Sequence, residues 1–188
     1  MSYVAWLPVR ASHLPLALRL ALRRCGVRLT ARLLHVHVRR QRMTEYAVDC
    51  SGLVRKVREY VISTSKFGVG QQEGSFKTPP GLHRVARKIG AGLPPGTVFK
   101  GRVPIGLTRG GMTNANICHR ILWLEGLEDA VNRGGNVDSF ARYIYIHGFG
   151  DELTLGRPAS HGCIHMAASD LLPLFDRAAV GTLVWISM

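Results

Sequence analysis

The stretch YIYIHGFGDELTLGRPASHGCIHM, residues 143–166, combines a clear strand pattern with a dense group of reactive side chains. Its first residues alternate between two faces of an extended chain, because successive side chains of a strand point in opposite directions. One face carries Tyr143, Tyr145 and His147, and the other carries Ile144 and Ile146. The pattern predicts a strand with His147 close to its end.

The second half of the stretch places His161, Cys163 and His165 at every second position behind a Gly- and Pro-rich loop. A cysteine attacks carbonyl groups as the thiolate, so a nucleophilic cysteine needs a nearby base. The loop over residues 148–159 is long enough to return the chain to the end of the strand. We therefore expect Cys163, as nucleophile, to lie within hydrogen-bond reach of His147, as base.

Small and polar neighbours of this pair are candidates for supporting roles. Gly162 leaves the backbone uncrowded, so its amide and that of Cys163 can point at a developing oxyanion. Ser160 and His161 are expected to hold the turn or to orient the base, and Gly148 follows the base directly.

The same stretch allows a second interpretation as a metal site. Together, His147, His161, Cys163 and His165 would supply four ligands of the kind that zinc prefers. Their spacing differs from the usual Cys and His pairs of zinc sites, which favours the nucleophile. The metal site therefore stays the less favoured of the two interpretations.

The rest of the chain is dominated by strand patterns. Alternating or apolar runs predict strands at residues 32–43, 53–63, 116–127 and 182–188, and a strand and turn over residues 97–106. The first two runs are separated by DCSG, so we expect two strands joined by a turn. A helix is predicted over residues 168–181, with Ser169 as its N-cap, Asp170 in its first turn and Gly181 just past its end. This order of elements predicts a mainly β fold, a sandwich or partly open barrel with a late α-helix.

Residues 13–26 predict an amphipathic helix with Ser12 as N-cap and Gly26 just past its end. Arg19 interrupts the apolar run, which argues against a signal peptide and against a membrane span. We expect a surface helix packed on the domain, with attachment of this basic region to a membrane surface or a cell wall as the alternative. The predicted organisation is a basic helical extension over residues 1–30 and one domain over residues 31–188.

The net charge of +13, from 25 Lys plus Arg and 12 Asp plus Glu, makes the surface attractive to anions. Nucleic acid, anionic lipid and the polymers of a bacterial envelope are all anionic. Aromatic residues are sparse among the many N-terminal arginines, which argues against a base-stacking surface. The four cysteines are widely spaced and include no CxxC pair, so a disulfide scaffold is not expected.

The motif IHG, followed sixteen residues after its histidine by the cysteine of SHGCIHM, resembles the signature of L,D-transpeptidases with a YkuD-type catalytic domain. These enzymes remodel bacterial peptidoglycan. The segments VISTSKFGVGQQEGSFKTPPGLHRV and RILWLEGL with NRGGNVDS and RYIYIHG are also similar to that family. The resemblance covers roughly residues 31–187.

The resemblance implies a cysteine acyltransferase without a cofactor, located in the cell envelope or periplasm. Cys163 would attack the carbonyl of the diamino acid in a tetrapeptide stem, expel D-Ala and form a thioester, with His147 moving the proton. An amine of a second stem would then form a cross-link, whereas water would make the enzyme an L,D-carboxypeptidase. Carbapenems are the β-lactam class expected to acylate Cys163, and no nucleic-acid partner is implied.

Two residues depart from the family pattern. Phe149 stands where a threonine commonly follows IHG, and His165 stands where an arginine is most usual. His165 and Tyr145, which shares a strand face with His147, are the candidate substrate-binding residues. A non-catalytic wall-binding or nucleic-acid-binding copy of the domain is disfavoured, because both reactive groups, Cys163 and His147, are present.

Overall fold

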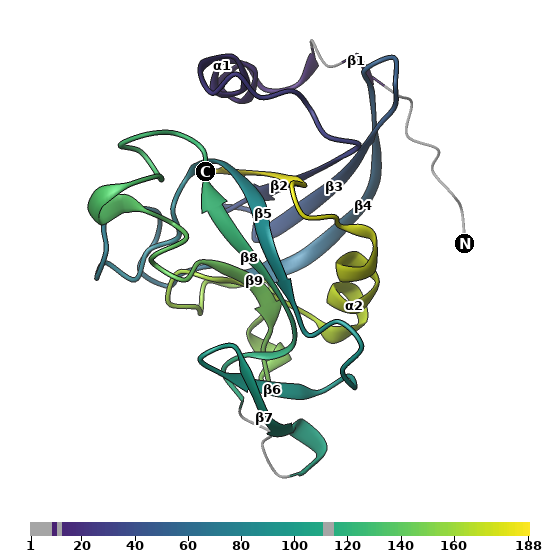
Figure 1. Ribbon diagram of the computed structural model, residues 1–188, viewed down its shortest axis with the longest axis vertical. Coiled ribbons are helices and arrows are strands. Elements are labelled where there is room, and N and C mark those ends of the chain that lie inside the picture. The colour runs from purple at the N-terminus through teal and green to yellow at the C-terminus, as the bar shows by residue number, and fades with distance from the viewer. Residues whose placement is uncertain (1–8, 11–12, 111–114) are drawn as a thin grey trace.

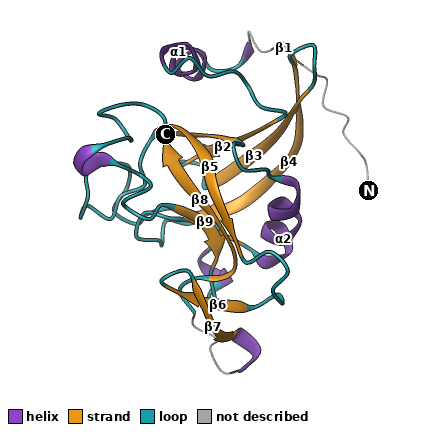
Figure 2. Cartoon of the chain, viewed as in Figure 1, coloured by secondary structure: helices purple, strands orange, loops and turns teal. Residues whose placement is uncertain are grey.

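The computed structural model describes residues 9–10, 13–110 and 115–188. These residues form a sheet of eleven strands with two α-helices and short 3-10 turns (Figure 2). The strands and helices, in chain order, are β1 Val9–Arg10, α1 Leu16–Arg24, β2 Arg32–His37, β3 Arg42–Val48, β4 Leu53–Ser63, β5 Gly81–Ile89, β6 Thr97–Lys100, β7 Val103–Leu107, β8 Cys118–Gly126, β9 Tyr145–Gly148, β10 Ile164–Met166, α2 Ala168–Arg177 and β11 Leu183–Ser187.

Eight of the strands close into a barrel, because β5 pairs with β8 as well as with β11. The order around the barrel is β5, β11, β2, β3, β4, β10, β9 and β8. The pairs β2–β11 and β9–β10 are parallel, and the other neighbours are antiparallel. The predicted mainly β fold with a late helix is confirmed.

The interior of the barrel holds the main hydrophobic core. Every barrel strand contributes at least one buried side chain to it, and α2 adds Leu171, Leu174 and Phe175. Burying a side chain of this size stabilises a fold by roughly 1.5–3 kcal/mol relative to leaving it exposed. The apolar face of α2 is therefore part of the core and holds the helix against β8 and β9.

The start of α2 differs from the prediction of Ser169 as N-cap, which is wrong. The N-cap is Ala167, whose side chain has no hydrogen-bonding group, and the helix begins at Ala168. The carboxylate of Glu152, in the preceding loop, accepts the Ala168 N–H at 2.7 Å and satisfies a free donor of the first turn. Gly181 lies beyond the helix in a left-handed conformation with φ +90° and does not cap it.

Residues 32–63 form three strands, not the two that the alternating pattern predicted. The chain turns between β2 and β3 at a segment without Gly, Pro, Asn or Asp, so the usual turn signal is missing. Gln41 takes a left-handed φ of 51° there. Its buried side chain donates to the Val38 carbonyl at 2.5 Å and accepts the Thr64 N–H at 2.8 Å. The turn predicted at DCSG does join β3 to β4.

Helix α1 covers the outer face of the barrel at the end opposite the β6–β7 hairpin (Figure 1). Its apolar side packs in one cluster with residues of β2, β4, β5 and β11, and the buried helix residues are Leu18 and Ala21. Gly26 lies just past the end of the helix, as predicted, with φ +62°. Its N–H donates to the Arg23 carbonyl, and the Val27 N–H donates to the Leu22 carbonyl. The expected N-cap, Ser12, lies outside the described residues. Neither helix is long and apolar enough to cross a membrane, within the part of the chain that the structure describes.

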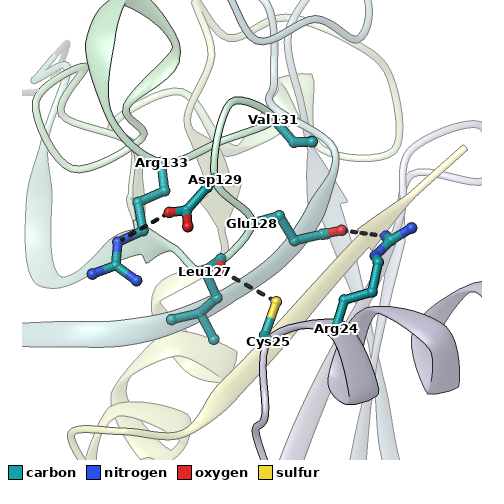
Figure 3. A pocket seen from close by; sticks show the side chains of 7 residues that line it. All are labelled: Arg24, Cys25, Leu127, Glu128, Asp129, Val131 and Arg133. Atoms are coloured by element: carbon teal, nitrogen blue, oxygen red, sulfur yellow. Dashed lines mark hydrogen bonds and ion pairs between the residues drawn. The ribbon is translucent and has the colours of Figure 1, made fainter.

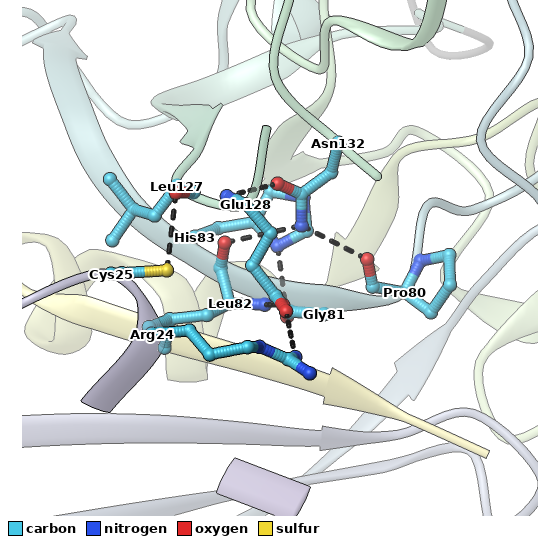
Figure 4. A network of polar contacts seen from close by, with 9 residues as sticks. All are labelled: Arg24, Cys25, Pro80, Gly81, Leu82, His83, Leu127, Glu128 and Asn132. Carbon is cyan, nitrogen blue, oxygen red and sulfur yellow. Dashed lines mark hydrogen bonds and ion pairs between the residues drawn. The ribbon is translucent and has the colours of Figure 1, made fainter. Parts of the chain in front are cut away.

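Two polar contacts attach the end of α1 to the loop after β8 (Figure 3). Arg24 pairs with the carboxylate of Glu128 at 2.7 Å, and the Cys25 thiol donates to the Leu127 carbonyl at 3.2 Å. Glu128 also accepts the Leu82 N–H at 2.7 Å, and its own N–H donates to Asn132 (Figure 4). The buried carboxylate thus ties α1 to the start of β5. The boundary at residue 30 remains a proposal.

Candidate active site

The parallel pair β9–β10 brings the two halves of the decisive sequence stretch together. His147 on β9 lies directly opposite His165 on β10. Cys163, two residues before His165, therefore lies beside Tyr145, two residues before His147. Side chains in register on neighbouring strands point to the same face. The four residues therefore share the outer face of the barrel, where Tyr145 and Cys163 pack in one cluster with Trp123.

His147 is 2% exposed, and its Nδ1 lies 2.7 Å from the carbonyl oxygen of Gly148. A carbonyl can only accept, so Nδ1 carries the proton and Nε2 has a free lone pair. Burial lowers the pKa of His147 to about 4, although the hydrogen bond to Gly148 opposes this shift. The imidazole is therefore neutral at neutral pH and can accept a proton at Nε2.

Cys163 directly precedes β10, and its thiol lies 3.4 Å from the carbonyl oxygen of Tyr143. Tyr143 lies outside the strand predicted to include it, because its left-handed φ of 58° turns the backbone before β9 begins. Burial raises the pKa of Cys163 to about 11, while the Tyr145 N–H and the charge of Arg142 lower it. Among the described residues no hydrogen bond joins the thiol to His147.

The turn before Cys163 is held by Ser160 and by a glycine that the backbone requires. Ser160 is buried, and its hydroxyl donates to the Cys163 carbonyl at 2.6 Å and accepts the Gly162 N–H at 3.3 Å. Gly162 has φ +120°, and a Cβ there would lie 3.3 Å from Ile144 Cδ1. The Gly162 carbonyl accepts from the Thr78 hydroxyl at 3.0 Å. The Gly162 N–H thus donates to Ser160 in this structure.

The histidines on either side of Cys163 face different surroundings. His161 is exposed and packs edge-on against Phe67 and Phe76. His165 is 6% exposed, stacks on Phe149 at 4.3 Å, and lies 4.8 Å from the His147 ring. Burial lowers the pKa of His165 to about 3, with smaller contributions from the charges of His147 and His161. His165 is therefore neutral, unlike an arginine in the same place.

Two arginines that the sequence did not single out act on this site. Arg142 donates to the backbone carbonyls of Gln71 at 2.6 Å and Lys77 at 2.8 Å, which holds the loop before β5 beside Cys163. Arg102, at the tip of the β6–β7 hairpin, donates to the Tyr145 hydroxyl at 3.2 Å. No pattern in the local sequence signals either contact, because each depends on a distant segment.

Within the described ranges, no group of three or more His, Cys, Asp or Glu side chains is placed to hold a metal ion. The structure thus offers no support for the zinc interpretation. A cavity of about 490 Å³, lined by neither reactive group, lies between Arg24 and Cys25 on one side and Glu128 and Arg133 on the other (Figure 3). A smaller one of about 330 Å³ is lined by Phe149, His119 and Arg109, next to the β9–β10 face.

The comparisons with known proteins agree with this geometry. A model of the L,D-transpeptidase catalytic domain, YkuD, matches residues 31–186. The chain belongs to this family. No curated protein matches the chain.

Solved structures share the L,D-transpeptidase fold with this domain at low identity. Bd1075 of Bdellovibrio bacteriovorus has a TM-score of 0.54 at 15% identity, covering 85% of this chain and 48% of that one. L,D-transpeptidase 3 of Mycobacterium tuberculosis with a faropenem-derived adduct has a TM-score of 0.52 at 13% identity, covering 84% and 60%. A variant of the helical cell shape determining protein Pgp2 of Campylobacter jejuni has a TM-score of 0.51 at 17% identity, covering 85% and 47%. The chain therefore spans about half to three-fifths of these relatives.

Proposed function

We propose that this protein is a cysteine acyltransferase that acts on peptidoglycan stem peptides in the cell envelope, as an L,D-transpeptidase. One observation carries the proposal most directly. His147 is fixed by the Gly148 carbonyl as a neutral base, and it lies on the strand next to the one that Cys163 precedes. A nucleophile with a base that a third group orients is the arrangement that acyl transfer through a covalent intermediate requires.

The proposed reaction begins with a neutral thiol and a neutral imidazole. Rotation of the Cys163 side chain moves Sγ from the Tyr143 carbonyl toward His147, and Nε2 accepts the thiol proton as Sγ attacks the carbonyl carbon of the diamino acid. A C–S bond forms, and the C–N bond to D-Ala breaks as His147 returns the proton to the departing amine. The amine of a second stem, or water, then attacks the thioester carbonyl. A C–N or C–O bond forms, the C–S bond breaks, and the proton of the attacking group passes through His147 to the released Cys163 thiolate.

The proposal assigns the remaining residues positioning roles. Ser160 and Thr78 hold the turn that carries the nucleophile, and Arg142 favours the thiolate through its charge. The amides of Cys163 and Tyr145 are the candidate donors to the oxyanion, since the Tyr145 N–H already faces Sγ. Binding of the basic N-terminal region to the wall or to a membrane surface belongs to the same proposal.

The test uses a carbapenem and, separately, faropenem, which forms an adduct in the Mycobacterium tuberculosis relative. We expect one covalent equivalent on Cys163 by intact mass and peptide mapping, without added metal. Cys163→Ala abolishes labelling, and His147→Ala slows it by about 10²- to 10⁴-fold. The matched control Cys50→Ala, which removes an exposed thiol, labels like the native protein.

A second measurement tests the substrate. A disaccharide tetrapeptide should lose its terminal D-Ala in the presence of the native protein and not of Cys163→Ala. Stoichiometric bound zinc with a Cys163 that reacts only after chelation would overturn the proposal in favour of a metal site. A metal-free Cys163 that neither labels nor releases D-Ala would indicate a non-catalytic binding module.

A further inference from the structure

Three aromatic rings form an exposed cluster where the loop before β5 meets the turn before Cys163. The ring centroids of Phe67 and Phe76 are 6.0 Å apart, and His161 lies 5.6 Å from the first and 5.9 Å from the second. Phe67 is 46% exposed and Phe76 is 56% exposed. We call Phe67, Phe76 and His161 the aromatic platform. Large apolar side chains are usually buried, so a cluster left open to solvent points to a binding surface.

The backbone of the platform is strained at Phe76. Phe76 has a left-handed φ of 56°, a conformation that is rare for a bulky side chain. The buried Ser65 holds it there, because its hydroxyl donates to the Phe76 carbonyl at 2.6 Å and accepts the Phe67 N–H at 3.0 Å. One serine thus positions both phenylalanines. Strain of this kind is typically kept where it serves function.

The platform is continuous with the proposed active site. His161 precedes Cys163 by two positions, so their Cα atoms are at most about 7 Å apart. A cavity of about 150 Å³ is lined by Phe76 and His161 together with Tyr143, whose carbonyl accepts from the Cys163 thiol. A substrate bound at Cys163 therefore passes the platform if it extends toward the loop before β5.

We propose that the aromatic platform binds a sugar ring of the glycan strand that carries the stem peptide. This inference rests on the proposed function and names a part of the substrate that the nucleophile does not contact. Three residues and the linker to the stem separate the sugar from the attacked carbonyl, and the residues alone span about 10 Å when extended. The Cα atom of His161 lies within about 7 Å of that of Cys163, and the Phe67 and Phe76 ring centroids lie 5.6 Å and 5.9 Å from that of His161.

The chemistry of the sugar suits exposed aromatic rings. The face of an aromatic ring is negative, and the C–H groups on one side of a sugar ring present a positive edge to it. The stem residues near the reacting bond, a diamino acid and D-Ala, offer charged groups and a methyl group. The sugar is therefore the largest apolar face that such a substrate can place on the platform.

The test compares substrates with and without sugar in the double variant Phe67→Ser/Phe76→Asn. Asparagine tolerates a left-handed φ better than phenylalanine, so the loop is expected to keep its fold. We expect the ratio of kcat/KM for disaccharide tetrapeptide to that for free tetrapeptide to fall about tenfold. Phe67→Leu/Phe76→Leu keeps apolar bulk without a ring face and should lose most of the same preference. Val180→Ser, at an exposed valine after α2, should leave the ratio unchanged.

A binding measurement separates this inference from the proposed function. Glycan strands stripped of their stems should bind the native protein by calorimetry and bind the serine–asparagine variant about tenfold more weakly. An equal loss of kcat/KM on both substrates, an unchanged ratio, or a leucine variant that keeps the full preference would overturn the sugar assignment. A protein that binds stripped glycan through the platform and never acylates Cys163 would refute the proposed function alone.

Discussion

His165 stacks on Phe149 with ring centroids 4.3 Å apart and ring planes 14° from parallel. Both positions depart from the pattern of the family. Because the two side chains touch, the departures are coupled. A neutral His165 can stack on the Phe149 ring next to His147. A threonine at position 149 would remove that stacking contact.

The coupling predicts a non-additive pair of substitutions. His165→Arg alone forces a charged group into a site that is 6% exposed, so we expect it to destabilise the protein clearly. Adding Phe149→Thr makes room and supplies a hydroxyl, and the double-mutant cycle should yield a favourable coupling of about 0.5–3 kcal/mol. Urea unfolding of the four proteins measures it. Strictly additive effects would show that the stack is incidental.

The protonation states at the site predict an unusual pH profile for acylation. The pKa of His147 is lowered to about 4 by burial, so the base is available at every pH above that value. The pKa of Cys163 is raised to about 11, so the thiol persists across the same range. The rate of β-lactam acylation should stay level from about pH 5 to 10 and fall as the pH drops through about 4. A midpoint near 6.5 in stopped-flow acylation would contradict this protonation scheme.

Arg142 predicts a shift at the alkaline end of that profile, where the Cys163 thiol ionises with a pKa of about 11. Its charge lowers the pKa of Cys163, and its guanidinium also holds the carbonyls of Gln71 and Lys77. Arg142→Gln should move the alkaline limb of acylation to higher pH. Arg142→Lys retains the charge and should leave that limb in place, even if the loop loosens. Identical profiles for both variants would assign Arg142 a purely structural role.

The ion pair between Arg24 and Glu128 predicts that removing each partner lowers the free energy of unfolding by a different amount. Glu128 is 7% exposed, and removing it by Glu128→Ala leaves the buried Leu82 N–H without an acceptor, at a cost of about 1–3 kcal/mol. The side chain of Arg24 is 68% exposed, so Arg24→Ala should cost less than about 1 kcal/mol. Glu128→Gln keeps an acceptor and should fall between them. Equal losses in urea unfolding would mean that the ion pair matters more than the Leu82 contact.

The buried histidines predict a loss of stability in mild acid. Burial lowers the pKa of His83 and His147 to about 4 and that of His35 and His165 to about 3. Between those values and about 6.5 the unfolded chain binds protons that the folded chain does not, so stability falls as pH decreases. Each histidine adds up to about 1.4 kcal/mol per pH unit.

Thermal unfolding between pH 7.5 and 4.5 measures this dependence. His83→Gln removes one titrating group while keeping a side chain that can reach Ser139, so its stability should depend less steeply on pH than that of the native protein. An unchanged slope would show that His83 does not contribute to acid lability.

Local patterns in the sequence were sufficient for much of the fold. β4 alternates because one of its faces is largely exposed, whereas β8 and β9 are buried on both faces. Gly26 marks the end of α1 because few residues adopt φ +62°. The separation of β2 from β3 was missed, because Gln41 makes the turn through contacts with Val38 and Thr64 and not through a turn residue type. The cap of α2 was missed for a similar reason, since Glu152 supplies it from another segment.

The same division applies to the candidate site. Cys163 and His147 could be named from residue type and spacing, because a nucleophile and a base carry their chemistry in their side chains. Their environment depends on the parallel pairing of β9 with β10, which places His165 opposite His147. The Cys163 thiol donates to the Tyr143 carbonyl. Arg142 and Ser65 act through backbone carbonyls and amides of other loops. A backbone group has the same chemistry in every residue, so only the folding that brings distant segments together gives it a role in the site.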